Sequence, residues 1–158
     1  MLVAEVAEAY LTAADKQQSD QLMSIVALAL DRFDVYRSSH GEDASKSVLA
    51  DVARAIRGLA ATVGIVAAAY RNGTIVLIAP EVDASSAREL GEAIWNAVTK
   101  LRLRNPESTA SDQVTASVAA ITGRMKHNVD PAHLLTEALS KVQDLAATGG
   151  NRVLAMSV

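Results

Sequence analysis

Blocks of apolar and polar residues along this chain predict alternating helices and strands. Between Leu2 and Leu11 the apolar residues recur at helical spacing, which predicts an amphipathic first helix. A polar break follows, and Leu22–Leu30 is a short, continuous apolar run typical of a buried strand. Asp31–Gly41 is polar and irregular, so we expect a turn of helix and a loop there.

The next apolar stripe predicts a helix from about Ala44 to Ala61, with Asp43 or Ser45 as its N-cap. Its packed face is expected to consist of Val48, Leu49, Val52, Ile56 and Leu59.

A β-hairpin is predicted at the centre of the chain. Two runs rich in β-formers, Gly64–Tyr70 and Thr74–Ala79, flank Arg71-Asn72-Gly73. Asn-Gly is the strongest short signal for a tight turn between antiparallel strands. Pro80, which lacks an amide hydrogen, suits the end of the second strand.

The last third of the chain predicts four more elements around a polar loop at Arg102–Asp112. Asp83 or Ser85 is placed to cap the first of the two helices, and Gly149-Gly150 to end the second. The four elements are a helix over Ala84–Leu101 (packed face Leu90, Ile94, Trp95 and Val98), a strand over Val114–Ile121, a helix over Pro131–Ala147 and a strand over Arg152–Val158.

This order of elements predicts an α+β fold: a mixed, ferredoxin-like sheet of about five strands surrounded by helices. The 158 residues suffice for one domain with a sizeable core. We divide the chain into an N-terminal helix and connector over 1–22 and a domain over 23–158.

Composition excludes several classes of function. Half of the residues are apolar and only 3% are aromatic, so Ala, Val, Leu and Ile must build the core. The net charge of −3 provides no basic field for nucleic acid or anionic lipid. The chain has no cysteine, which excludes disulfides and thiolate sites. Neither a signal peptide nor a membrane-spanning run is evident, so we expect a soluble, cytoplasmic protein.

Four blocks, in matching order and spacing, make the chain resemble the GGDEF family, the diguanylate cyclase domain of bacterial signalling. The second block is the hairpin, whose tip Arg71-Asn72-Gly73-Thr74-Ile75 stands where the family reads Gly-Gly-Asp/Glu-Glu-Phe. The others are Leu28–Phe33 with Val48-Leu49 and Val52-Ala53, then Val114–Val118, and then Leu134-Leu135 through Ala138 to Gly149, Asn151 and Val153. The resemblance implies a nucleotidyl-cyclase-like fold.

The resemblance also implies that the catalytic carboxylates are missing. Active members use two metal ions to hold GTP, with ligands from the end of the first strand and from the hairpin tip. The corresponding residues here are Ala29, Gly73 and Thr74, which cannot supply the anionic oxygens that hard divalent cations require. Asp31 remains nearby, but one carboxylate does not make a two-metal site.

Groups that bind the nucleotide are replaced as well. The guanine-binding Asn and Asp of the family correspond to Arg37 and Lys46, and its phosphate-binding Lys and Arg to Ala146 and Gly150. The product-inhibition motif Arg-x-x-Asp corresponds to 62–65, where the chain reads Thr-Val-Gly-Ile. We therefore expect no catalytic residue, metal or cofactor. We define the vestigial positions as Ala29, Asp31, Phe33, Arg37, Lys46, Arg71, Asn72, Gly73, Thr74 and Ala146.

The leading hypothesis is a catalytically inactive, degenerate GGDEF-like domain that acts as a regulatory or protein-interaction module in bacterial cyclic-dinucleotide signalling. Its expected partner is a protein, such as a sensor or receiver module. The alternative is a receptor that binds GTP or cyclic di-GMP without turnover, and an unrelated small α+β enzyme is a third option. The stripe on the first helix suits either pairing in a homodimer or docking on its own sheet.

Other polar residues have simpler interpretations than catalysis. His40, His127 and His133 are scattered, so we expect surface histidines. Arg71 and Asn72 suit a tight turn better than an anion site. Phe33 and Trp95 are expected in the core, because a chain so poor in aromatics uses them for packing.

Overall fold

The computed structural model describes residues 2–3, 21–60, 65–70, 73–103, 114–125 and 130–158. Six strands of this described part form one mixed sheet in the order β1-β3-β4-β2-β5-β6. The strands are β1 (Leu2–Val3), β2 (Leu22–Leu30), β3 (Val66–Tyr70), β4 (Thr74–Pro80), β5 (Ala116–Arg124) and β6 (Val153–Ser157). The helices are α2 (Phe33–Arg57), α3 (Ala84–Lys100) and α4 (Pro131–Ala147).

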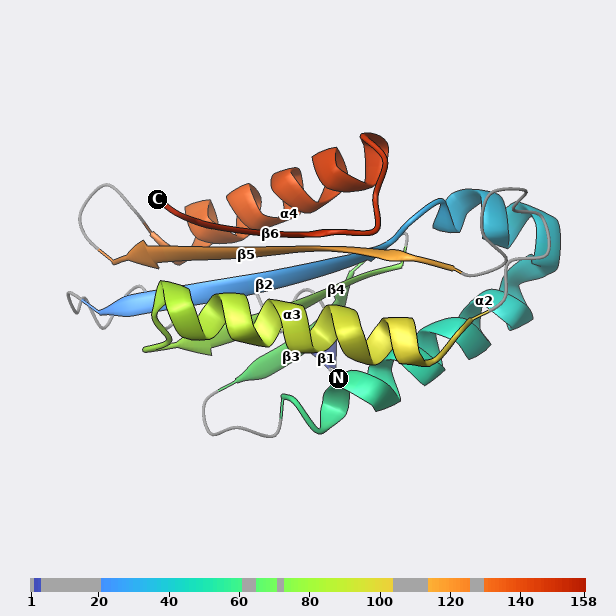
Figure 1. Cartoon of the computed structure of the whole chain (residues 1–158), viewed down its shortest axis with the longest axis horizontal. Helices are drawn as coiled ribbons and strands as arrows, with labels where there is room; N and C mark the ends of the chain where they lie inside the picture. Colours follow the sequence, from blue (N-terminus) through green and yellow to red (C-terminus); the bar gives the residue numbers. More distant parts are fainter. Residues whose placement is uncertain (1, 4–20, 61–64, 71–72, 104–113, 126–129) are drawn as a thin grey trace.

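The helices cover both faces of the sheet, with α4 on one face and α2 and α3 on the other (Figure 1). Strand β2 lies in the middle, antiparallel to both β4 and β5. Its residues from Met23 to Leu30 are buried on both faces, because alternate side chains enter the core layers under α4 and under α2 and α3. The continuous apolar run of the sequence arises from this double cover. The predicted α+β sheet is confirmed.

Several elements match their predictions closely. Strand β2 has the predicted bounds, and α4 begins at Pro131 and ends at Ala147. The hairpin forms, with Tyr70 opposite Thr74. Strand β5 begins at Ala116 rather than Val114 and continues to Arg124. The predicted core face of the second helix is correct: Val48, Val52 and Ile56 are buried, and Leu49 and Leu59 pack against them.

The prediction for Asp31–Gly41 is correct in part: this segment contains more helix than the single turn expected, and it ends in a non-helical residue, Gly41. Helix α2 begins at Phe33, after Arg32 in the left-handed region (φ 54°), and continues to Arg57 with a kink at Gly41 (φ 87°, ψ 175°). The second helical segment starts directly after Gly41, a few residues before the predicted start at Ala44, and the Ser45 hydroxyl donates a hydrogen bond to the Gly41 carbonyl. The buried rings of Phe33 and Tyr36 anchor the first segment to the core. Two aromatic anchors thus outweigh the polar composition around them.

The first two described residues also depart from the prediction. Leu2 and Val3 form a strand, parallel to β3, with Leu2 opposite Ala68 and Val3 opposite Ala69. The rest of the predicted first helix lies outside the described residues. Pairing with β3 satisfies the main-chain hydrogen-bonding groups of Leu2 and Val3. The spacing of apolar residues within the segment cannot reveal such a long-range pairing. The division into 1–22 and 23–158 stays a prediction.

Two further expectations concern rings and membranes. Phe33 is buried and Trp95 packs against the core, as predicted. His133 is exposed, His127 lies outside the described residues, and His40 is half-buried with its ring 4.6 Å from that of Tyr36. The surface prediction is therefore wrong for His40.

None of the helices in the described ranges is long and apolar enough to cross a membrane.

Helix α3 offers a test of its N-cap. The Asp83 carboxylate accepts a hydrogen bond from the Ser86 N–H at 2.8 Å, which holds the pKa of Asp83 below its ordinary value of 3.8. A lowered folded-state pKa adds stability above the unfolded pKa, and this stability is lost as pH falls through the folded value. We expect Asp83→Asn to keep the cap but remove this acid dependence, measured by thermal unfolding between pH 2 and 5. Glu81→Gln, a change at a neighbouring exposed carboxylate, should keep the wild-type profile.

Candidate functional site

Four of the vestigial positions, Ala29, Asp31, Gly73 and Thr74, meet where β2 ends between the starts of β4 and β5. Ala29 lies opposite Thr74 on one side and Ser117 on the other. The Leu30 N–H donates to the Gly73 carbonyl at 3.1 Å, and the Asp31 N–H donates to the Thr115 carbonyl at 2.8 Å. Main-chain pairing therefore brings Ala29 next to Gly73 and Thr74, which lie far from it in the sequence.

Neutral groups fill the position between β2, β4 and α4. Ala29 and Thr74 are almost fully buried, and Ala29 belongs to the core layer beneath α4. The Thr74 hydroxyl accepts a hydrogen bond from Gln143 Nε2 of α4 at 3.3 Å. A methyl, a hydroxyl and an amide cannot balance the charge of a divalent cation. Among the described residues, no group of three or more His, Cys, Asp or Glu side chains could hold a metal ion. These residues do not fit a two-metal centre.

Asp31, the carboxylate nearest to this position, is used by the fold. It is 8% exposed. Its oxygens accept hydrogen bonds from the Thr115 hydroxyl at 2.7 Å, the Ser117 hydroxyl at 2.7 Å and the Asn151 N–H at 2.8 Å. All three donors belong to the segments that lead into β5 and β6 or to β5 itself. Asp31 therefore fastens the end of β2 to the beginning of these two strands.

Gly150 makes room for the Asp31 carboxylate. The glycine has φ +65°, and a Cβ atom there would lie 2.5 Å from Asp31 Cγ. Its N–H donates to the Leu145 carbonyl at 2.9 Å as α4 ends. The predicted glycine stop is therefore correct, and Gly150 also permits the close approach of a buried carboxyl group.

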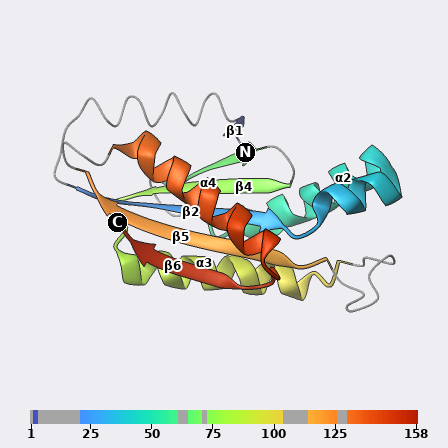
Figure 2. The same cartoon turned by 90° about the horizontal axis from the view of Figure 1, so that it is seen from above.

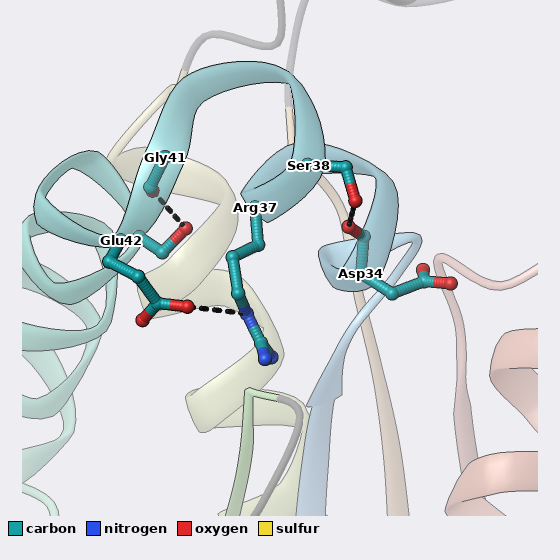
Figure 3. Close-up of polar contacts among 6 residues, drawn as sticks. Asp34, Arg37, Ser38, Gly41 and Glu42 are labelled. Carbon is teal, nitrogen blue, oxygen red and sulfur yellow. Dashed lines mark hydrogen bonds and ion pairs between the residues drawn. The ribbon is translucent and has the colours of Figure 1, made fainter.

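Phe33 and Arg37 cover the hairpin on the other side of β2. A Cβ atom on Gly73 (φ +70°) would lie 2.8 Å from the Phe33 ring, so ring and backbone are in close contact. The Arg37 guanidinium lies 5.4 Å from the centre of the same ring, and Arg37 Nε lies 3.9 Å from Glu42 Oε1 across the helix kink (Figure 3). A side chain of this chain thus occupies the space between the start of α2 and the hairpin.

The remaining predicted positions are not gathered with these. Lys46 is exposed on α2 beyond the Gly41 kink, and Ala146 is half-buried near the end of α4. Arg71, Asn72 and residues 62–64 of the motif equivalent lie outside the described residues, and Ile65 is half-buried.

Sequence reasoning missed the polar partners of this site. Thr115 and Ser117 had a visible signal, since two hydroxyl residues separated by one position lie on the same face of an otherwise apolar strand. Gln143 had none, because a glutamine on a helix surface is ordinary. Only the packing of α4 against β4 brings it to Thr74.

Comparison with known proteins identifies the family of this fold. A family model described as "Diguanylate cyclase, GGDEF domain" matches residues 5–152. The chain belongs to the GGDEF family. No curated protein sequence matches this GGDEF domain significantly.

Solved GGDEF structures share its fold. The coiled coil and GGDEF domain of DgcB from Caulobacter crescentus, in complex with c-di-GMP, superposes with a TM-score of 0.79 and 22% identity over 98% of this chain and 80% of that chain. The active GGEEF domain of a diguanylate cyclase from Vibrio cholerae gives 0.70 and 15% over 92% and 88%. The diguanylate cyclase SiaD from Pseudomonas aeruginosa, in complex with its activator SiaC, gives 0.75 and 16% over 98% and 57%. At these identities the likeness establishes the fold.

Proposed function

We propose that this GGDEF domain does not synthesise cyclic di-GMP and instead works as a regulatory or protein-interaction module in bacterial cyclic-dinucleotide signalling. The observation that carries the proposal is the neutral contact of Ala29, Thr74 and Gln143 at the meeting of β2, β4 and α4. Holding a triphosphate with two divalent cations needs several converging carboxylates. The buried alanine and threonine leave no anionic oxygen there.

The role of Asp31 supports the same conclusion. A metal ligand needs lone pairs that are free to face the ion, whereas the oxygens of Asp31 accept three hydrogen bonds from the fold. Moving this carboxylate toward Thr74 would leave two hydroxyls and a main-chain N–H without their acceptor. The hydrogen bonds that Asp31 makes within the fold therefore account for a carboxylate at this position.

A protein partner is the favoured ligand. The described part of the chain retains two hydrophobic core layers, although the polar groups for GTP are replaced. Arg37 in the space above Phe33 puts a cation where the family resemblance implies a guanine-binding asparagine. SiaD shows that a relative of this fold binds an activator protein. These observations support a domain whose fold serves to bind another protein.

The decisive assay is incubation of the purified chain with GTP and Mg²⁺ or Mn²⁺, with cyclic di-GMP measured by liquid chromatography. We expect no product above the level of an enzyme-free sample, while an active GGDEF domain assayed in parallel produces it. Product that disappears in the near-isosteric variant Thr74→Val would mean that this site is active and the proposal is wrong.

Calorimetry separates the module from the second candidate, a receptor that binds GTP or cyclic di-GMP without turnover. We expect no heat of binding from either nucleotide at high micromolar concentrations. Saturable heat that is reduced by Arg37→Ala would instead favour the receptor, because the Arg37 guanidinium lies over the Phe33 ring, which contacts Gly73 of the hairpin.

A further inference from the structure

The outer edge of β6 offers unpaired main-chain groups. Strand β6 is the last of the sheet, and in the described part of the chain it pairs with β5 alone. It lies along one side of the molecule with its far edge turned away from β5 (Figure 2). The opposite edge of the sheet differs, because β1 pairs there with β3.

The hydrogen bonds to β5 reveal which groups face outward. The Arg152 carbonyl accepts from the Val118 N–H, and the Val158 N–H donates to the Thr122 carbonyl. In a parallel pair, alternate residues direct both main-chain groups to the same neighbour. The even-numbered residues of β6 therefore bond to β5. Val153, Ala155 and Ser157 direct their N–H and C=O groups away from the sheet.

This outward pattern is symmetric about Ala155. In an antiparallel pair of two β6 strands centred there, Ala155 lies opposite its own copy and Val153 lies opposite Ser157. Each of these residues then exchanges both main-chain bonds with its opposite. All the outward groups of both strands are satisfied, and the residue on the two-fold axis has one of the smallest side chains.

The side chains fit the same register. Leu154 of one copy lies opposite Met156 of the other, on the face that carries α4, and both are half-buried members of that core layer. Apolar cross-strand pairs stabilise a sheet. Natural edge strands are usually protected by lysine, proline or a bulge. β6 reads Val-Leu-Ala-Met-Ser, without charge or proline.

We propose that this chain forms a two-fold symmetric dimer in which the β6 strands of two copies pair antiparallel about Ala155 and join their sheets into one. We take a second copy of the chain as the occupant, because the register about Ala155 pairs Leu154 with Met156 across the axis and places no charged residue within the paired strands. The proposal is independent of whether the domain makes cyclic di-GMP.

Disulfide trapping tests the register directly, because the chain contains no cysteine. In the variant Ala155→Cys, the two Cα atoms would lie about 5.5 Å apart, which is within the range that a disulfide spans. The matched control Ser157→Cys places its two thiols four residues apart along the pair, about 13 Å. We expect mild oxidation to trap the Ala155→Cys dimer at least ten-fold faster than the control. Equal rates would overturn the proposal.

A mixture extends the test. Val153→Cys and Ser157→Cys lie opposite one another across the proposed axis, so mixing the two variants should trap the heterodimer faster than either homodimer. Trapping of only the two homodimers would contradict the antiparallel register.

The unmodified chain provides the equilibrium test by sedimentation. We expect a reversible dimer that Ala155→Pro weakens at least 100-fold, since the ring removes an outward N–H and leaves the bonds to β5 intact. Ala155→Ser, which keeps the N–H, should pair like the wild type. A wild-type chain that is monomeric at millimolar concentration overturns the proposal. If Ala155→Pro fails to fold, the trapping rates decide the question.

Discussion

Replacing Asp31 with alanine should destabilise the domain by about 3–5 kcal/mol, because three donors lose their acceptor in a buried site. The Thr115 and Ser117 hydroxyls and the Asn151 N–H all donate to this one carboxylate. For a chain of this size, the loss corresponds to a fall in melting temperature of roughly 10 °C. Guanidinium unfolding monitored by circular dichroism measures it.

Two further variants make this result specific. Asp31→Asn keeps one acceptor oxygen but turns an NH₂ group toward a donor, so we expect an intermediate loss of about 1–3 kcal/mol. Asp144→Asn, at an exposed carboxylate of α4, should stay within about 0.5 kcal/mol of the wild type. An Asp31→Ala variant as stable as Asp144→Asn would show that the Asp31 carboxylate does not fasten the strands.

The second large effect is expected at Gly150. Gly150→Ala should cost about 3 kcal/mol: about 1 from the left-handed backbone and the rest from the clash with the Asp31 carboxylate. The distance of 2.5 Å from a Cβ atom to Asp31 Cγ requires one of the two segments to move. For the same reason, we expect Gly150→Arg, which restores the arginine implied by the family resemblance, to lower the stability of the domain.

A double-mutant cycle identifies the cause. When Asp31 is already alanine, the clashing carboxylate is absent, so Gly150→Ala should cost only about 1 kcal/mol and the two changes should not add. Gly58→Ala is the glycine control, because Gly58 has helical dihedrals with open space around it and should lose nothing. Additive effects of Asp31→Ala and Gly150→Ala would exclude a direct clash between the two residues.

The position of Ala29 beside the hairpin could be predicted from the sequence, whereas the partners of Asp31 could not. Sequence spacing placed Ala29 at the end of a strand and Gly73-Thr74 at a hairpin, and their meeting follows from the antiparallel pairing of β2 with β4. The partners of Asp31 come from 84 to 120 residues further along the chain, so no local pattern could assign them. From the sequence alone, Asp31 is a single carboxylate close to Ala29, and nothing local indicates that it fastens strands.

The two errors in secondary structure share one cause. Helix α2 begins at Phe33 because the rings of Phe33 and Tyr36 are buried in the hydrophobic core. Leu2–Val3 forms a strand because it pairs with the edge of β3. In both segments a long-range contact outweighed the local preference.

By itself, the sequence determined the α+β class, the order of the main elements, the glycine stops and the uncharged character of Ala29, Gly73 and Thr74. These are matters of apolar period, turn chemistry and residue identity, which are local. The tertiary structure alone decided that Asp31 serves the fold, that Gln143 reaches Thr74 and that β6 presents an edge symmetric about Ala155. Each of these depends on which strands lie side by side, and that is settled by burial of the whole core rather than by any one segment.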